Sequence, residues 1–163
     1  MKRIFALLLI VLMLLAAVGC EDEETGASFE ALSVRGVKLA LDAKAAPLID
    51  ALGEPRAFAE TNSCYGDGKD KVYEYTSFKV TTYSNGGEDY VLSVEIFDDA
   101  DATLATPEGI RIGSSRDDVV KAYGECEDES ATKLVYESNG VRLRFWLDGG
   151  VVTGIKYLKA DND

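Results

Sequence analysis

The residues best suited to binding chemistry alternate along one short segment of the sequence. Arg142, Arg144 and Trp146 occupy every second position there. The intervening positions are apolar: Val141, Leu143, Phe145 and Leu147. Alternate side chains of a strand point to opposite faces of a sheet, so the two guanidinium groups and the indole are expected to lie together. Tryptophan and arginine dominate binding hot spots, and the pattern therefore predicts non-covalent recognition.

A second predicted strand, residues 78–83, corresponds to this one in the other half of the chain and extends the same face. It adds Lys79 and Tyr83, and the candidate binding face is Lys79, Tyr83, Arg142, Arg144 and Trp146. An alternative stays open, because cross-strand ion pairs are common in antiparallel sheets. In that case the arginines pair with acids of neighbouring strands, and Trp146 covers the sheet edge. The acids in question are Glu74, Glu95 and Glu137.

The sequence offers little to catalysis or to metal binding. It contains no histidine, which excludes histidine-dependent triads and histidine-ligated metals. There is no glycine-rich phosphate loop and no nucleophile elbow, and the many carboxylates single out no pair. The cluster Asp98, Asp99 and Asp101 lacks the ligand spacing of a calcium loop and is expected to be a solvated linker. We expect no catalytic residue, no metal and no cofactor, with a hydrolase that uses carboxylates alone as a distant alternative.

Two cysteines remain once Cys20 is set aside for the reason given below. Cys64 and Cys126 form a candidate disulfide, because an even pair in an exported chain is a common bridge. Equivalent points of side-by-side halves lie about 15 Å apart, beyond the roughly 7 Å that a disulfide spans between Cα atoms. The loop 54–70 would have to close that gap. The alternative is two separate buried thiols.

The N-terminus predicts export and anchoring. Lys2 and Arg3 precede an apolar run, residues 4–18, which is too short for a membrane-spanning helix and typical of a signal peptide. The run ends at Gly19-Cys20 and resembles the lipobox of bacterial lipoproteins, which implies lipidation of Cys20 and localisation at the extracytoplasmic side of the cell membrane. Ala17 departs from the usual leucine, and an ordinary signal peptidase could also cut there. We expect residues 1–19 to be the signal peptide and 20–28 an acidic tether.

The charge balance bears on the partners. The 163 residues carry a net charge of −12, which becomes −14 without Lys2 and Arg3. A nucleic-acid partner is therefore not expected, because phosphate binding needs the opposite sign. Residues 29–163 have the length of a single domain.

An internal repeat organises that domain. Residues 36–39 match 109–112, and 48–54 match 119–125, which predicts helices at 45–52 and 116–123. The apolar period then changes to two, which predicts three strands in each half. These strands are 71–75, 78–83, 91–97, 133–137, 141–147 and 151–158. A hairpin over 29–34 and 36–41 is expected to open the domain. The expected fold is α+β, with two repeats (29–104 and 105–163) of one helix plus a three-stranded antiparallel sheet, and with both helices on one face of a shared sheet.

This order of elements resembles that of the β-lactamase inhibitor protein and, as a single unit, the small lipoprotein of the outer-membrane assembly machine. The stretches 70–73, 89–91 and 106–115 are similar to those of a group of uncharacterised lipoproteins of Gram-positive bacteria. This similarity implies no particular activity. We expect a non-catalytic, lipid-anchored binding module for an envelope protein or a wall polymer. The alternative is a structural or assembly lipoprotein of the cell envelope.

Overall fold

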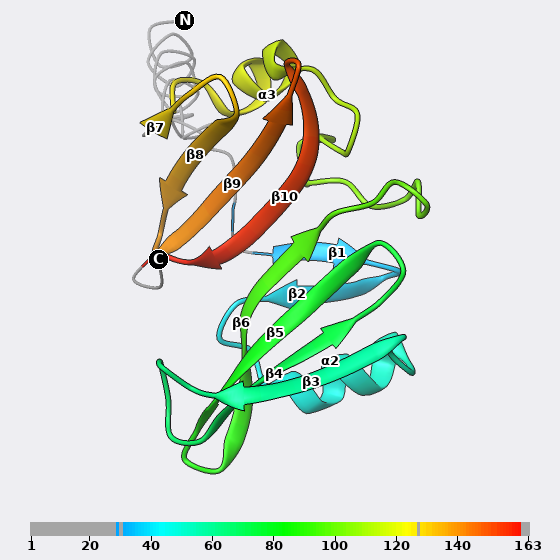
Figure 1. Ribbon diagram of the computed structural model, residues 1–163, viewed down its shortest axis with the longest axis vertical. Helices are drawn as coiled ribbons and strands as arrows, with labels where there is room; N and C mark the ends of the chain where they lie inside the picture. Colours follow the sequence, from blue (N-terminus) through cyan, green and yellow to red (C-terminus); the bar gives the residue numbers. More distant parts are fainter. Residues whose placement is uncertain (1–28, 30, 127, 161–163) are drawn as a thin grey trace, which may run out of the picture.

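The computed structural model describes residues 29, 31–126 and 128–160 of the chain (Figure 1). The signal peptide, the tether and Cys20, as predicted above, lie outside the described residues. Within these residues, two helices and ten strands follow one another along the chain. They are β1 Ala31–Val34, β2 Val37–Ala40, α2 Ala45–Leu52, β3 Ala57–Asn62, β4 Lys69–Glu74, β5 Phe78–Asn85, β6 Glu88–Ile96, α3 Arg116–Tyr123, β7 Asp128–Glu129, β8 Lys133–Ser138, β9 Val141–Asp148 and β10 Val151–Lys159.

The expected fold class is wrong. Strands make up 49% of the described residues and helices 12%, so the chain is mostly β. Eight strands form one antiparallel sheet in the order β3-β4-β5-β6-β10-β9-β8-β7, and β1 and β2 form a small sheet of their own. The prediction of two helix-plus-three-strand repeats overlooked β3 and β7, which add an edge strand at each end of the large sheet.

The two short helices lie where the sequence places them. Ser115 caps α3, because its hydroxyl accepts from the backbone N–H of Asp118 and the Asp118 carboxylate accepts from the N–H of Ser115. Gly124 follows the helix with a φ of 78°, a conformation that favours glycine. The earlier helix, α2, lacks a side-chain cap at Lys44 and is followed by Gly53.

The centre of the sheet is the antiparallel pair β6–β10, where Ile155 lies opposite Ile96. The two halves of the chain therefore meet through their last strands, and strand order in one half runs opposite to that in the other. In consequence β3 and β7 lie at the two outer edges of the sheet, which Figure 1 shows at the lower and upper ends of the molecule.

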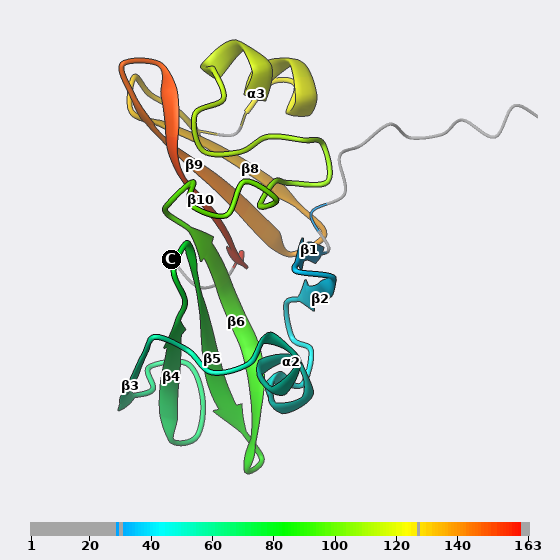
Figure 2. The same ribbon diagram turned by 90° about the vertical axis from the view of Figure 1, so that its right-hand side faces the viewer.

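One continuous apolar core covers a single face of the large sheet. It joins Leu52 of α2, Val119 of α3 and Leu32 of the β1–β2 hairpin to inward side chains of the central strands. Figure 2 shows α2 beside β6 and α3 beside the upper strands. Leu158 and Val135 are also buried, at 4% and 6% exposure, but they lie outside this core. They alternate with core residues along their strands and therefore belong to the opposite face, which we call the outer face.

The described part of the chain contains no helix that is long and apolar enough to cross a membrane.

Candidate functional site

Strand register brings charged side chains of four neighbouring strands into one row on the outer face. Lys79 of β5 lies opposite Glu95 of β6, Glu95 lies opposite Lys156 of β10, and Lys156 lies opposite Arg144 of β9. Arg142 and Trp146 flank Arg144 on the same strand and the same face, while Phe145 between them is fully buried in the core. We call these six side chains the outer-face patch: Lys79, Glu95, Arg142, Arg144, Trp146 and Lys156.

Trp146 is held flat against the sheet by a glycine in the neighbouring strand. Gly154 lies opposite Trp146, next to a register shift in β10. A Cβ atom built on Gly154 would lie 2.9 Å from Cε3 of the indole, so the ring occupies the space that a side chain would need. The guanidinium carbon of Arg144 lies 5.8 Å from the indole centroid, in cation–π range. The indole thus packs on the backbone of Gly154, and the guanidinium group of Arg144 lies over its ring.

Ion pairs link several patch residues, as the pairing alternative expected. Lys79 Nζ lies 3.1 Å from Glu95 Oε1, and Lys156 Nζ lies 3.8 Å from Glu95 Oε2. Arg142 pairs with Glu137 of β8 at 3.1 Å. Such partly exposed pairs contribute about 0–1 kcal/mol each to stability. These pairs hold the cations in place but add little to the stability of the fold.

Two cations of the patch lie on neighbouring strands. Lys156 of β10 is opposite Arg144 of β9, and Lys156 also pairs with Glu95 on its other side. The row therefore alternates cations with a carboxylate beside Trp146.

Gly154→Ala tests how Trp146 is held. The new methyl group would force the indole off the sheet, because the built contact is shorter than real Cβ contacts. Trp146 is the single tryptophan of the sequence, so its fluorescence reports on this position alone. We expect the emission to shift to longer wavelength as the ring gains water, with a stability loss of about 1 kcal/mol. Val151→Ala, at an exposed position of the same strand, is the control, and identical spectra for both variants would contradict the description.

Tyr83, which the sequence analysis placed on the binding face, lies outside the apolar core but is covered by other side chains. Its side chain is 8% exposed, and its hydroxyl donates to Asp42 Oδ1 at 2.7 Å. The ring of Tyr65 packs edge to face on the Tyr83 ring, with 4.7 Å between the ring centroids, and Lys159 Nζ lies 5.5 Å from the centroid of the Tyr83 ring. Lys159 also pairs with Asp42 at 3.0 Å. These contacts join the end of β10 to β5 and to the segment after β2. Tyr83 therefore has a structural role and is not part of the outer-face patch.

Tyr83→Phe should change how stability depends on pH. Burial and the hydrogen bond to Asp42 raise the pKa of the Tyr83 hydroxyl to about 12. The unfolded chain releases this proton near pH 10, so stability is full below pH 10 and is lost as pH rises toward 12. Tyr83→Phe should make that alkaline loss less steep and cost about 1 kcal/mol at pH 7. Urea unfolding between pH 7 and 12 measures both effects, and an unchanged slope would contradict this reading.

The two cysteines among the described residues lie far apart in the structure. Both are free thiols, and they lie two residues beyond β3 and two residues before β7, the opposite edges of the sheet. Seven strand spacings separate those edges, about 33 Å along the sheet, far beyond disulfide range. The candidate disulfide between Cys64 and Cys126 is therefore not formed in this fold. The assumption of side-by-side halves with equal strand order had placed them too close together.

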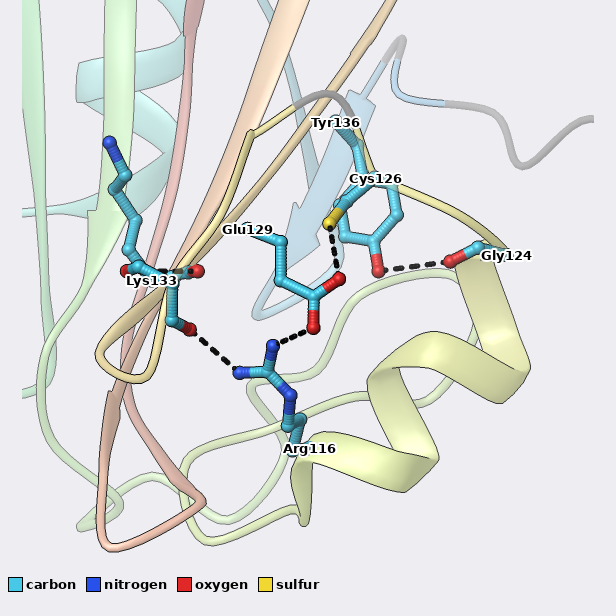
Figure 3. Close-up of polar contacts among 7 residues, drawn as sticks. Arg116, Gly124, Cys126, Glu129, Lys133 and Tyr136 are labelled. Carbon is cyan, nitrogen blue, oxygen red and sulfur yellow. Dashed lines mark hydrogen bonds and ion pairs between the residues drawn. The ribbon is translucent and has the colours of Figure 1, made fainter.

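Cys126 instead belongs to the contact between α3 and β7 (Figure 3). Its sulfur lies 3.9 Å from Glu129 Oε2, and Arg116 of α3 pairs with the same carboxylate. Arg116 also donates to the carbonyl of Ser130 at 2.9 Å, and Tyr136 donates to the carbonyl of Gly124 at 3.3 Å. These contacts fasten the helix to the edge of the sheet, and they form no nucleophile–base arrangement.

The acids of the 98–101 segment turn toward their own backbone. Asp98 Oδ1 accepts from the N–H of Ala100 at 2.7 Å, and Asp101 accepts from Thr103 and pairs with Arg35 at 3.4 Å. Across the described residues, no group of cysteine, aspartate and glutamate is arranged to hold a metal ion.

Gly154, which shapes the candidate site, is a residue that the sequence analysis missed. A glycine inside a predicted strand signals a close approach of another group, and this signal was present between Val152 and Ile155. The parity argument did place Lys79, Arg142, Arg144 and Trp146 on one face, where the structure brings them together.

Comparison with known proteins shows a distant structural likeness. No protein-family model and no curated protein matches the sequence. Among solved structures, the fold is similar to a cysteine-rich secretory protein of Staphylococcus aureus, with a TM-score of 0.54 and 11% sequence identity. The match covers 74% of this chain and 44% of that protein, so the chain spans less than half of its length. At this identity, the shared property is the fold.

Proposed function

We propose that this protein is a non-catalytic binding module, held by a lipid on Cys20 at the extracytoplasmic side of the cell membrane. The outer-face patch recognises its partner, an envelope protein or a wall polymer. The observation that carries the proposal is the fixed indole of Trp146, laid on Gly154 and flanked by Arg144, on the face of the sheet opposite the core.

The geometry suits recognition because the platform under the patch is rigid. All four strands that supply the patch are inner strands of the sheet, with a hydrogen-bonded neighbour on each side. Their inward side chains, including Phe78, Ile96, Phe145 and Ile155, are fully buried. Side chains fixed on such a support lose little freedom on binding, which favours affinity.

The expected anchor is compatible with a partner near the membrane. An acidic tether of eight residues after Cys20 spans at most about 28 Å when fully extended. The domain would therefore reach partners within the envelope while staying attached to the lipid surface.

A specific observation supports the alternative of a structural or assembly role. All six residues of the edge strand β3 are exposed, and Phe58 at its second position is 53% exposed. An exposed edge strand can add a strand from another chain. In that case the edge of the sheet, rather than its outer face, would hold the contact.

Co-purification from detergent-solubilised membranes distinguishes the two roles. We expect a defined set of partners with the anchored wild-type protein and with Phe58→Ala, and loss of that set with Trp146→Ala. Truncating a hot-spot tryptophan costs about 2 kcal/mol or more, which weakens a complex at least thirtyfold. Loss with Phe58→Ala and retention with Trp146→Ala would overturn the proposal in favour of the edge strand.

A further inference from the structure

We propose that two copies of this chain associate through their exposed edge strands β3, which pair antiparallel and join the two large sheets into one. The inference goes beyond the proposed function, because it concerns a second copy of the chain and an edge of the sheet that the outer-face patch does not use.

The two edges of the large sheet differ in how they are protected (Figure 1). At one edge, β7 has two residues, both acidic, and Arg116 of α3 contacts Glu129 and the carbonyl of Ser130. At the other edge, all six residues of β3 are exposed, and the strand pairs with β4 in a regular register. Lysine, proline and bulges commonly prevent edge-to-edge pairing, and β3 contains none of them. This strand is therefore open to pairing with an additional strand.

The backbone of β3 presents hydrogen-bonding groups to such a strand at every second residue. Directly after β3, the N–H of Ser63 donates to the carbonyl of Gly68 at 2.9 Å, in the register of the β3–β4 pair. Because hydrogen bonds alternate along antiparallel strands, the odd-numbered residues of β3 turn their N–H and C=O groups toward β4. Phe58, Glu60 and Asn62 therefore direct theirs away from the sheet.

This alternation and the charge of Glu60 select one register for two copies of β3. Both copies must offer even-numbered residues to each other, which leaves two registers with nearly complete overlap. In the first, Glu60 lies opposite Glu60 of the second copy, and like charges in opposed positions are destabilising. In the second, Ala59 lies opposite Ala59 of the second copy, and Phe58 lies opposite Glu60. We infer the second register, because it opposes no like charges.

The composition of β3 suits a second copy of an acidic chain. Each copy carries −12, so two copies repel each other overall. Within β3, the single charged residue is Glu60, and its carboxylate pairs with Lys69 of the same copy at 2.9 Å. The odd-numbered residues on the outer face are small: Ala57, Ala59 and Thr61. Two copies can therefore approach at β3 with little local repulsion and little steric hindrance.

The symmetry of this pairing suits two copies attached to one membrane. The two-fold axis of an antiparallel edge-to-edge pair is perpendicular to the sheet, so both copies keep the same face on the same side. Phe29, the first described residue after the tether, belongs to the core and packs on Tyr123 of α3, with 5.5 Å between the ring centroids. Both tethers would therefore begin on the helix-covered side of the joined sheet, and both outer-face patches would lie on the other side.

The contact between two six-residue strands is small. It buries less than the roughly 1,200 Å² at which standard interfaces begin, so free molecules should associate weakly. Confinement of both copies to one membrane raises their effective concentration and favours the pair. The association is therefore best measured in cells that express the full chain.

Cysteine crosslinking in intact cells tests the pairing and its register. The parent is the full chain with Cys64→Ser, which removes the exposed thiol near β3 and reports any bond through the remaining cysteines. Ala59→Cys places its thiol directly opposite that of the second copy, with about 4.5 Å between the Cα atoms, within disulfide range. Thr61→Cys is the matched control, exposed on the same face of the same strand, because the two copies of position 61 lie about 14 Å apart. We expect at least about tenfold more disulfide-linked dimer from Ala59→Cys.

Glu60→Pro, added to Ala59→Cys, tests the backbone contact. Proline removes an N–H that points to the second copy and leaves the hydrogen bonds to β4 in place, so the dimer yield should fall by about tenfold. Glu60→Ala is the control and should keep the yield. No dimer from Ala59→Cys, an equal or higher yield from Thr61→Cys, or an unchanged yield in Glu60→Pro would overturn the inference.

Trp146→Ala separates this inference from the proposed function, and it should leave the crosslinking yield unchanged. If the dimer forms while Trp146→Ala keeps its membrane partners, the proposed function fails and the pairing of β3 stands. If Trp146→Ala loses those partners while Ala59→Cys gives no dimer, the proposed function stands and the pairing fails.

Discussion

Phe145→Ala will lower the free energy of unfolding by about 3–5 kcal/mol, the usual cost of removing a buried aromatic side chain. Phe145 is 0% exposed, and its ring lies 5.4 Å from that of Tyr123 on α3 and 6.1 Å from that of Tyr136 on β8. Its truncation would leave a cavity between the helix and the sheet that neither ring can fill. Urea-induced unfolding, followed by circular dichroism, measures the loss.

The neighbouring residue provides the control. Trp146 is larger than Phe145 but lies on the opposite face of the same strand, outside the core. Trp146→Ala should therefore cost about 1 kcal/mol, mostly from the uncovered backbone at Gly154. If Trp146→Ala unfolds the domain as severely as Phe145→Ala, the assignment of the two faces is wrong, and the patch cannot be a binding surface.

Cys20→Ala should abolish lipidation of the protein. The substitution removes the sulfur that would carry the lipid, so labelled fatty acid should no longer be incorporated, and the precursor should stay uncleaved or the domain be released. Acyl chains bind a bilayer by about 0.8 kcal/mol per buried methylene, and no charge of the tether replaces them. Fractionation of cells after labelling measures both effects.

Cys64→Ala is the matched control, because Cys64 is an exposed thiol within the folded domain. It should keep the label and the membrane attachment. Labelling that survives in Cys20→Ala would exclude the lipobox. A wild-type protein that is cleaved and released without label would show that an ordinary signal peptidase cuts at this position instead.

The two faces of the sheet could be assigned from the sequence, because a shift of one residue in the register of a strand would exchange its inward and outward side chains. Burying Arg142 and Arg144 in place of Leu143 and Phe145 would cost several kcal/mol for each guanidinium group. The helix bounds were also predictable, since Ser115 and Gly124 are strong end signals. Local chemistry of this kind is encoded by neighbours in the chain.

The edge strands could not be predicted for the opposite reason. All six residues of β3 are exposed, so the segment shows no apolar period, and its structure comes from pairing with β4. β7 has two residues, both acidic, and exists through its pairing with β8. Missing these two strands led to the wrong fold class, because each half then seemed to hold three strands.

Strand order is a long-range property, and two further errors followed from it. The pairing of β6 with β10 places the segments that contain Cys64 and Cys126 at opposite edges of the sheet. The sequence pattern does not indicate which strands of the two halves pair with each other. The burial of Tyr83 depends on Asp42 and Lys159, residues distant from it in the chain. Parity predicted the side to which Tyr83 points, and tertiary contacts then covered it.

Photo-crosslinking on membranes tests the central claim, recognition through the outer face, most directly. A photoreactive residue at position 81 would replace Thr81, which lies on the outer face of β5 opposite Ser93, and a second at position 117 would replace Asp117, an exposed residue of α3. The account predicts a discrete adduct from position 81 that disappears in Trp146→Ala, and none of the same mass from position 117. An adduct that forms from position 117 alone, or one from position 81 that persists in Trp146→Ala, would contradict it.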